Sequence, residues 1–210
     1  AAGVDAVKLQ TYTADTLTLD CDRPDFLIEG GLWAGRKLYE LYQEAYTPWD
    51  WQERLFERGR ELGLAVFSTP FDRTALEFLR GLDAPAYKVA SFEVVDLPLV
   101  AEIASVGKPL VISTGMANLG EIAEAVETAR SAGGKELILL HCISSYPTPI
   151  NESNLETLQH LAQTFDVIVG LSDHTMGTVV SVAAVALGAC FIEKHFTLRR
   201  DDGGPDAAFS

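Results

Sequence analysis

Short apolar segments alternate along the chain with amphipathic segments of helical periodicity. The apolar segments are rich in strand-forming residues, and several lack polar alternation, which is typical of strands covered on both faces. They are residues 6–11, 65–69, 86–91, 109–114, 137–142, 167–171 and 190–196. Strict alternation of strand and helix predicts parallel strands joined by crossover helices.

Helix boundaries are marked between these segments. Asp72 is expected to cap a helix over residues 73–80. The stretch 47–50 resembles a capping box, with Pro48 in the first helical position, and predicts a helix start there. The apolar stretch 179–189 is far shorter than the roughly 20 residues of a membrane span, so we expect it to form a buried helix.

Polar residues gather where the predicted strands end. They are Gln10, Thr69, Ser91, Glu93, Ser113, Thr114, His141, Asp173, His174 and His195. A TIM (β/α)8 barrel collects its site from all its strand ends, whereas an open doubly wound sheet concentrates it at one switch point. Both architectures remain possible at this stage, and the distribution favours the barrel.

Seven strands are recognisable, whereas a barrel needs eight. Ala1-Ala2-Gly3 looks like the tail of a helix, and a closing helix is expected after Ser210. We therefore expect residues 1–210 to form an incomplete barrel domain that lacks strand one and the final helix.

Composition narrows the classes of function. The 210 residues are 48% hydrophobic, which suits one globular domain. Their formal net charge of −14 argues against nucleic acid as a partner. An anionic ligand would need a local cluster of lysines, hydroxyls or a metal. Three widely spaced cysteines and no visible signal peptide indicate free thiols and a cytoplasmic protein.

Two histidines are candidate metal ligands. His174 ends the sixth strand segment and His195 lies in the last, so neighbouring strands would bring both rings to one mouth of the barrel. Two imidazoles with open positions suit a catalytic divalent metal. Hydrogen-bonded core histidines are an equally good interpretation at this stage, and His160 is expected at the surface.

Lys8 and Lys88 lie within otherwise apolar strands. A buried ammonium must pair with a carboxylate or reach an anion, because leaving it alone is costly. A structural ion pair with Glu93 or Glu193 is one explanation, and a phosphate site among the strand-end hydroxyls is the other.

Two loops add candidate ligands. Prolines brace the loop that carries Tyr146 and could hold its ring over a ligand. The turn after the last strand could deliver Asp206 to the same site. An ordinary proline-braced loop and a flexible turn are the alternatives.

Seven motifs, in order and spacing, resemble the sialic-acid synthase family. They are residues 7–11, 67–72, 87–91, 112–116, 141–147, 170–174 and 192–196. The resemblance implies a TIM barrel followed by a small antifreeze-like domain in a domain-swapped homodimer. It also implies the condensation of phosphoenolpyruvate (PEP) with an acetamido sugar.

The resemblance assigns roles to individual residues. A metal, Mn²⁺ first and Mg²⁺ or Co²⁺ next, would be held by His174 and His195, with Glu93 as a catalytic carboxylate. The PEP contacts would be Lys8, Thr69, Lys88, Ser91, Ser113 and Ser172. The sugar contacts would be Gln10, Glu93, Tyr146 and Asp206.

The insert over residues 21–46 resembles the pseudaminate-synthase branch of the family. Its Phe26 and Trp33 suit a deoxy sugar with methyl and acetamido groups, although the segment could simply pack on the barrel rim. Phe92 and Ser144 depart from residues usual in the family, which affects the sugar contacts more than the reaction class. We expect a 2,4-diacetamido-2,4,6-trideoxy-altrose substrate, with N-acetylneuraminate or legionaminate synthesis as the alternative.

Two rivals lie outside this family. An aldose-phosphate synthase would need a second phosphate site, and no extra Arg/Lys cluster is found at a strand end. A non-catalytic sugar-binding barrel would bind neither metal nor PEP.

Overall fold

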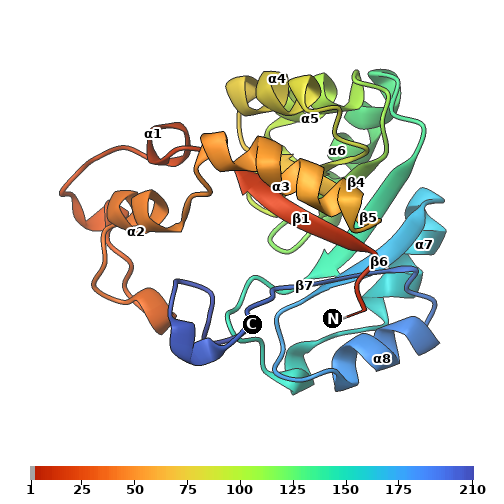
Figure 1. The fold of residues 1–210 in the computed structure, drawn as a ribbon. Coiled ribbons are helices and arrows are strands. Elements are labelled where there is room, and N and C mark those ends of the chain that lie inside the picture. The colour runs from red at the N-terminus through yellow and green to blue at the C-terminus, as the bar shows by residue number, and fades with distance from the viewer. Residues whose placement is uncertain (1–2) are drawn as a thin grey trace. The chain divides into compact units, whose positions relative to one another are not determined.

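Parallel strands joined by helices build both units of the chain, Ala1–Val89 and Ala90–Ser210, in the computed structural model (Figure 1). Residues 3–210 are described. The expected helix tail at Ala1 and Ala2 therefore lies outside the described residues.

The first unit holds three strands in chain order. Its elements are β1 (Ala6–Thr11), α1 (Ala14–Leu17), η1 (Pro24–Phe26), η2 (Gly31–Trp33), α2 (Leu38–Ala45), α3 (Trp49–Glu61), β2 (Ala65–Pro70), α4 (Arg73–Gly81) and β3 (Tyr87–Val89). β1 and β2 pair in parallel along six residues, and β2 pairs in parallel with β3. In Figure 1, α3 runs along β1, and α1 and α2 belong to the excursion of the chain between them.

Helix α3 packs closely on β2 because Gly59 has no side chain. A Cβ at Gly59 would lie 1.9 Å from a methyl carbon of Val66. Beside them the hydroxyl of Thr11 donates to Gln52 at 2.8 Å and lies 2.7 Å from the hydroxyl of Ser68. The mostly apolar core of this unit thus contains three hydrogen-bonded polar side chains, those of Gln52, Thr11 and Ser68.

The predicted start of α3 is wrong in detail. Pro48 is the N-cap, Trp49 is the first helical residue, and no side chain caps the helix. The amide of Trp51 instead bonds to the carbonyl of Pro48 at 3.1 Å. Asp72, by contrast, caps α4 as expected.

The second unit holds four strands in chain order. Its elements are η3 (Glu93–Val95), α5 (Leu97–Ala104), β4 (Leu110–Ser113), α6 (Leu119–Ser131), β5 (Leu137–Cys142), η4 (Ile150–Glu152), α7 (Thr157–Phe165), β6 (Ile168–Asp173), α8 (Val179–Ala186), β7 (Phe191–Lys194) and η5 (Arg200–Asp202). β4–β5, β5–β6 and β6–β7 are parallel pairs. Sequential parallel strands confirm the predicted barrel-type α/β fold class.

The expectation that residues 179–189 form a buried helix is wrong. Helix α8 buries Val180 and Ala184, while Val179, Val182 and Val185 are 70%, 67% and 56% exposed. Apolar composition predicted a helix covered on every side, but only the face toward β6 is covered in this structure. Among residues 3–210, no helix is both long and apolar enough to cross a bilayer.

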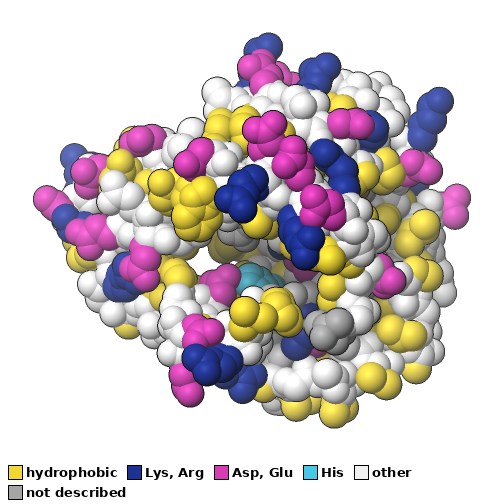
Figure 2. All heavy atoms as spheres, viewed as in Figure 1, with side chains coloured by type: hydrophobic (Ala, Val, Ile, Leu, Met, Phe, Trp, Pro, Cys, Tyr) yellow, Lys and Arg dark blue, Asp and Glu magenta, His cyan; other side chains and the backbone are white. Residues whose placement is uncertain are grey.

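Charges of both signs are interspersed on the face shown in Figure 2, with apolar side chains between them. His160 is exposed, as expected, and the three cysteines form no disulfide.

Candidate functional site

His174 and His195 lie side by side at the ends of neighbouring strands. β6 ends at Asp173 and β7 at Lys194, and these two residues are partners in the parallel register. The histidines follow directly, and their ring centroids are 5.2 Å apart with an angle of 62° between the planes. The expected adjacency is therefore present, whereas metal binding stays a prediction.

Each histidine is oriented through Nδ1. The Nδ1–H of His174 donates to the carbonyl of Ile143 at 2.9 Å. The Nδ1–H of His195 donates to the carboxylate of Asp206 at 2.8 Å. Because carbonyl and carboxylate oxygens can only accept, Nδ1 of each ring carries the proton, which leaves Nε2 as the nitrogen that could bind a metal.

This donor set fits a divalent metal with open positions. Ligating histidines commonly donate their other N–H to a carboxylate or a carbonyl, and this pair does both. No group of three or more His, Cys, Asp and Glu able to hold a metal occurs within residues 3–210. Two histidines would leave the other positions around a metal open, as catalytic metal sites do.

Aromatic rings enclose the histidines. The ring of Tyr146 lies 4.4 Å from that of His174 and 6.2 Å from that of His195, between centroids. Phe209, only 2% exposed, lies 5.0 Å from His195 and 5.2 Å from Tyr146. These rings exclude water from part of the site, which strengthens the polar interactions beside them.

A buried carboxylate, that of Glu193, lies two residues before His195. Ser172 and Glu193 are register partners, and the hydroxyl of Ser172 donates to Glu193 at 3.0 Å. Side chains two residues apart share one face of a strand. Ser172 and Glu193 therefore lie on the same strand faces as the two histidines that follow.

Asp173 lies on the opposite face, with no exposed side-chain surface. Burial opposes its charged form, but hydrogen bonds from Ser181, Thr175 and Lys194 outweigh burial, so the pKa of Asp173 is lowered. The carboxylate is therefore ionised at neutral pH.

His141 is a structural histidine. It is 6% exposed, and its Nε2–H donates to the carbonyl of Ser153 at 2.8 Å. Burial lowers the pKa of His141, and the bond to the carbonyl only partly opposes this. His141 is therefore neutral at neutral pH, and the bond to Ser153 fixes the loop that carries Tyr146.

Hydroxyl groups converge on Gly115 after β4. The amide of Gly115 donates to the hydroxyl of Ser91 at 3.2 Å. A Cβ at Gly115 would lie 2.5 Å from the hydroxyl of Ser144 and 2.8 Å from that of Ser91. The buried hydroxyls of Ser113 and Ser144 have no hydrogen-bond partner within residues 3–210. Such hydroxyls are suited to bind an anion.

Four predicted contacts belong to the first unit. Gln10 and Thr69 are register partners in β1 and β2, and Lys8 lies two residues before Gln10 on the same face. Lys88, in β3, is 3% exposed, and the buried Thr69 hydroxyl has no hydrogen-bond partner within the described part of the chain. Glu93, half-buried at the start of η3, belongs to the second unit.

Some residues around the histidines were not predicted as site residues. The position of Glu193, two residues before His195, was a sufficient signal that both share a strand face. The position of Phe209 could not be predicted, because it follows a turn of glycines and proline. The pattern of apolar residues does not specify where such a turn directs the backbone. Ser144 was visible in sequence only as a departure from the family pattern.

Comparison with known proteins shows the family of this chain. The sequence profile of the NeuB family matches residues 1–210, so the chain belongs to that family. The pseudaminic acid synthases of Helicobacter pylori and Campylobacter jejuni are 46% and 47% identical over 209 residues. These alignments cover 100% of this chain, but 62% and 61% of the relatives. The chain thus spans about three fifths of their length.

A solved structure of a similar protein has a similar fold. The crystal structure of an N-acetylneuraminic acid synthetase from Leptospira borgpetersenii, in complex with citrate, matches with a TM-score of 0.86 at 30% identity. The match covers 98% of this chain and 67% of that chain.

Proposed function

Because the chain belongs to the NeuB family, we propose that the whole protein condenses PEP with an open-chain acetamido sugar. We propose 2,4-diacetamido-2,4,6-trideoxy-altrose as the sugar, which gives pseudaminic acid and phosphate. The observation that carries the reaction class is the pair of histidines at adjacent strand ends, each oriented through Nδ1.

A divalent metal would be held by His174 and His195. Mn²⁺ is the first choice, with Mg²⁺ and Co²⁺ as alternatives, and the metal would supply Lewis-acid polarisation of the sugar aldehyde. The Ile143 carbonyl and the Asp206 carboxylate hold the two rings in the tautomer that this requires. Asp206 thus supports His195, and its predicted sugar contact stays a prediction.

PEP would be bound by charge and by hydroxyl donors. The proposed contacts are Lys8, Thr69, Lys88, Ser91, Ser113 and Ser172. The hydroxyls of Thr69 and Ser113 support this role, since both are buried and lack a hydrogen-bond partner within residues 3–210. An anionic oxygen would satisfy such groups.

The sugar would be bound by Gln10, Glu93, Tyr146 and Asp206. Carbon 3 of PEP forms the new bond to the aldehyde carbon, and the aldehyde oxygen gains a proton. Water adds at carbon 2 of PEP, and phosphate leaves with cleavage of the carbon–oxygen bond. Glu93 is proposed to stabilise the positive charge at carbon 2 and to take part in proton transfer.

The wider context is also proposed. The protein is expected to be a cytoplasmic homodimer in which residues 1–210 belong to a TIM barrel and an antifreeze-like domain follows that barrel. The unpaired cysteines support a reducing compartment. The dimer rests on the family resemblance.

One assay tests the reaction class. The full-length protein with Mn²⁺, the altrose sugar and PEP labelled in its bridging oxygen should release phosphate that contains the label. A protein with no phosphate release from any acetamido sugar, and no PEP affinity by calorimetry, would instead be a non-catalytic barrel.

A further inference from the structure

Asp173 and Lys194 form an ion pair, here called the clamp, directly before the two histidines. They are register partners at the last position of β6 and β7, and Lys194 Nζ lies 3.2 Å from Asp173 Oδ2. The side chain of Asp173 has no exposed surface and that of Lys194 is 25% exposed. The next residue on each strand is a histidine.

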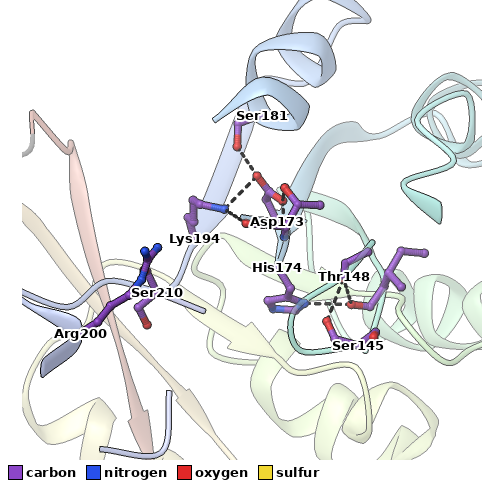
Figure 3. A network of polar contacts seen from close by, with 10 residues as sticks. Ser145, Thr148, Asp173, His174, Ser181, Lys194, Arg200 and Ser210 are labelled. Carbon is purple, nitrogen blue, oxygen red and sulfur yellow. Dashed lines mark hydrogen bonds and ion pairs between the residues drawn. The ribbon is translucent and has the colours of Figure 1, made fainter. Parts of the chain in front are cut away.

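The clamp bonds to two other residues of the second unit, Thr175 and Ser181 (Figure 3). Asp173 Oδ1 accepts from the amide and the hydroxyl of Thr175, at 2.8 and 2.7 Å. Asp173 Oδ2 also accepts from Ser181 of α8 at 2.5 Å, and Lys194 donates to the carbonyl of Thr175 at 2.6 Å. Thr175, which follows His174, is thus bonded to the last residue of β6 and to the last residue of β7.

The backbone of His174 is fixed from the other side as well. Its carbonyl accepts from the amide of Thr148 at 2.9 Å, and Thr148 forms a parallel bridge with Thr175. His174 therefore lies between two anchored segments. The position of His195 relative to it depends on how the ends of β6 and β7 are joined.

We propose that Asp173 and Lys194 are positioning residues that set the separation and orientation of His174 and His195. This inference rests on the proposed function, because it assumes that these two rings bind the metal. Alternation places the clamp side chains on the strand face opposite the histidines. The clamp therefore acts through the backbone, without touching metal or substrate.

The test is Mn²⁺ binding to the full-length protein, followed by the paramagnetic resonance signal of free Mn²⁺. Lys194→Met removes the ammonium, keeps the aliphatic chain and leaves Asp173 Oδ2 bonded to Ser181. We expect its Kd for Mn²⁺ to rise about 10-fold or more, as for other residues that orient metal ligands. Lys194→Arg should recover most of the affinity, because it restores the charged donor.

Two further variants separate positioning from general stability. Ser181→Ala removes the bond from α8 to the carboxylate and is expected to give a smaller rise in Kd. Arg58→Met breaks an exposed ion pair with Glu61 in the first unit and should leave the Kd unchanged. All titrations are run well below each variant's melting temperature, so that a loss of stability alone would not move the Kd.

Two outcomes would overturn the proposal that Asp173 and Lys194 position the histidines. One is a Kd for Lys194→Met within about 2-fold of wild type, a margin of only about 0.4 kcal/mol by the usual conversion of equilibrium constants. The other is a wild-type protein that binds no Mn²⁺. Failure of the proposed function looks different: tight Mn²⁺ binding by wild type, with no phosphate release from any sugar.

Discussion

At the scale of single residues, His195 is held by one carboxylate, which makes its role separable from folding. His195→Ala removes the Nε2 lone pair and should abolish metal binding without unfolding the protein, because the ring lies at a strand end. Asp206→Asn loses the charge that orients the ring and should weaken metal affinity about 10- to 100-fold. Metal content after dialysis, measured with the melting temperature, checks both. Full metal content in His195→Ala would show that the assignment is wrong.

His141 predicts a pH dependence of stability. Its pKa is lowered from 6.5 in the folded protein, so below pH 6.5 the unfolded chain binds more protons than the folded one. The contribution of neutral His141 is complete above pH 6.5 and is lost as the pH falls toward the lowered pKa. His141→Gln should therefore show a shallower decrease in unfolding free energy below pH 6.5.

Urea unfolding at several pH values measures this difference. One proton limits the difference in slope to about 1.4 kcal/mol per pH unit. Parallel curves for wild type and His141→Gln would mean that His141 does not titrate on unfolding.

The chemistry of the site could be predicted residue by residue, whereas its supporting contacts could not. His174 and His195 were recognisable because each directly follows or ends an apolar strand. The clamp between Asp173 and Lys194 depends on which residues of β6 and β7 are register partners. The sequence of one strand does not determine its register with the next strand. No role for Asp173 or Lys194 could therefore be predicted from the sequence.

At the scale of elements, the strands were predicted well because their cores are runs of buried apolar residues. Helix surroundings were harder to predict. Apolar composition indicated a covered helix over residues 179–189, but α8 covers only one face, since burial depends on neighbours that the local pattern does not specify. The start of α3 was wrong because Thr47 and Pro48 match a capping pattern that the backbone does not adopt.

The cap of α4 gives a prediction at this scale. Asp72 Oδ1 accepts from the amides of Thr74 and Ala75, at 2.6 and 3.2 Å. Asp72→Ala should lower the unfolding free energy by about 1 kcal/mol, within a range of about 0.5–2, because two amides lose their acceptor. Asp72→Asn is the matched control and should lose only a few tenths. Equal loss in both variants, in urea unfolding, would assign the effect to charge instead of capping.

At the scale of the whole molecule, the fold class was predictable because strand and helix alternate without interruption. The choice of sugar is harder, since it depends on loops. The insert after β1 contains η1, η2 and α2, with Phe26 and Trp33 half-buried within it. Its internal contacts include a bridge between Leu27 and Lys37, and an ion pair of Arg36 with Glu44 at 2.6 Å. The insert is therefore ordered, and its ligand contacts stay a prediction.

Similarity and loop chemistry together predict the preferred sugar. The chain is 46–47% identical to pseudaminic acid synthases and 38% identical to a Campylobacter jejuni N,N'-diacetyllegionaminic acid synthase. An apolar pocket for one methyl group discriminates by about 1–3 kcal/mol, or roughly 10- to 200-fold. The full-length enzyme should therefore show a kcat/KM at least about 10-fold higher for the altrose derivative than for N-acetylmannosamine, with the legionaminate precursor also below it. Steady-state phosphate release with the three sugars measures this order. A higher kcat/KM for N-acetylmannosamine would overturn the choice of sugar while leaving the proposed roles of His174 and His195 intact.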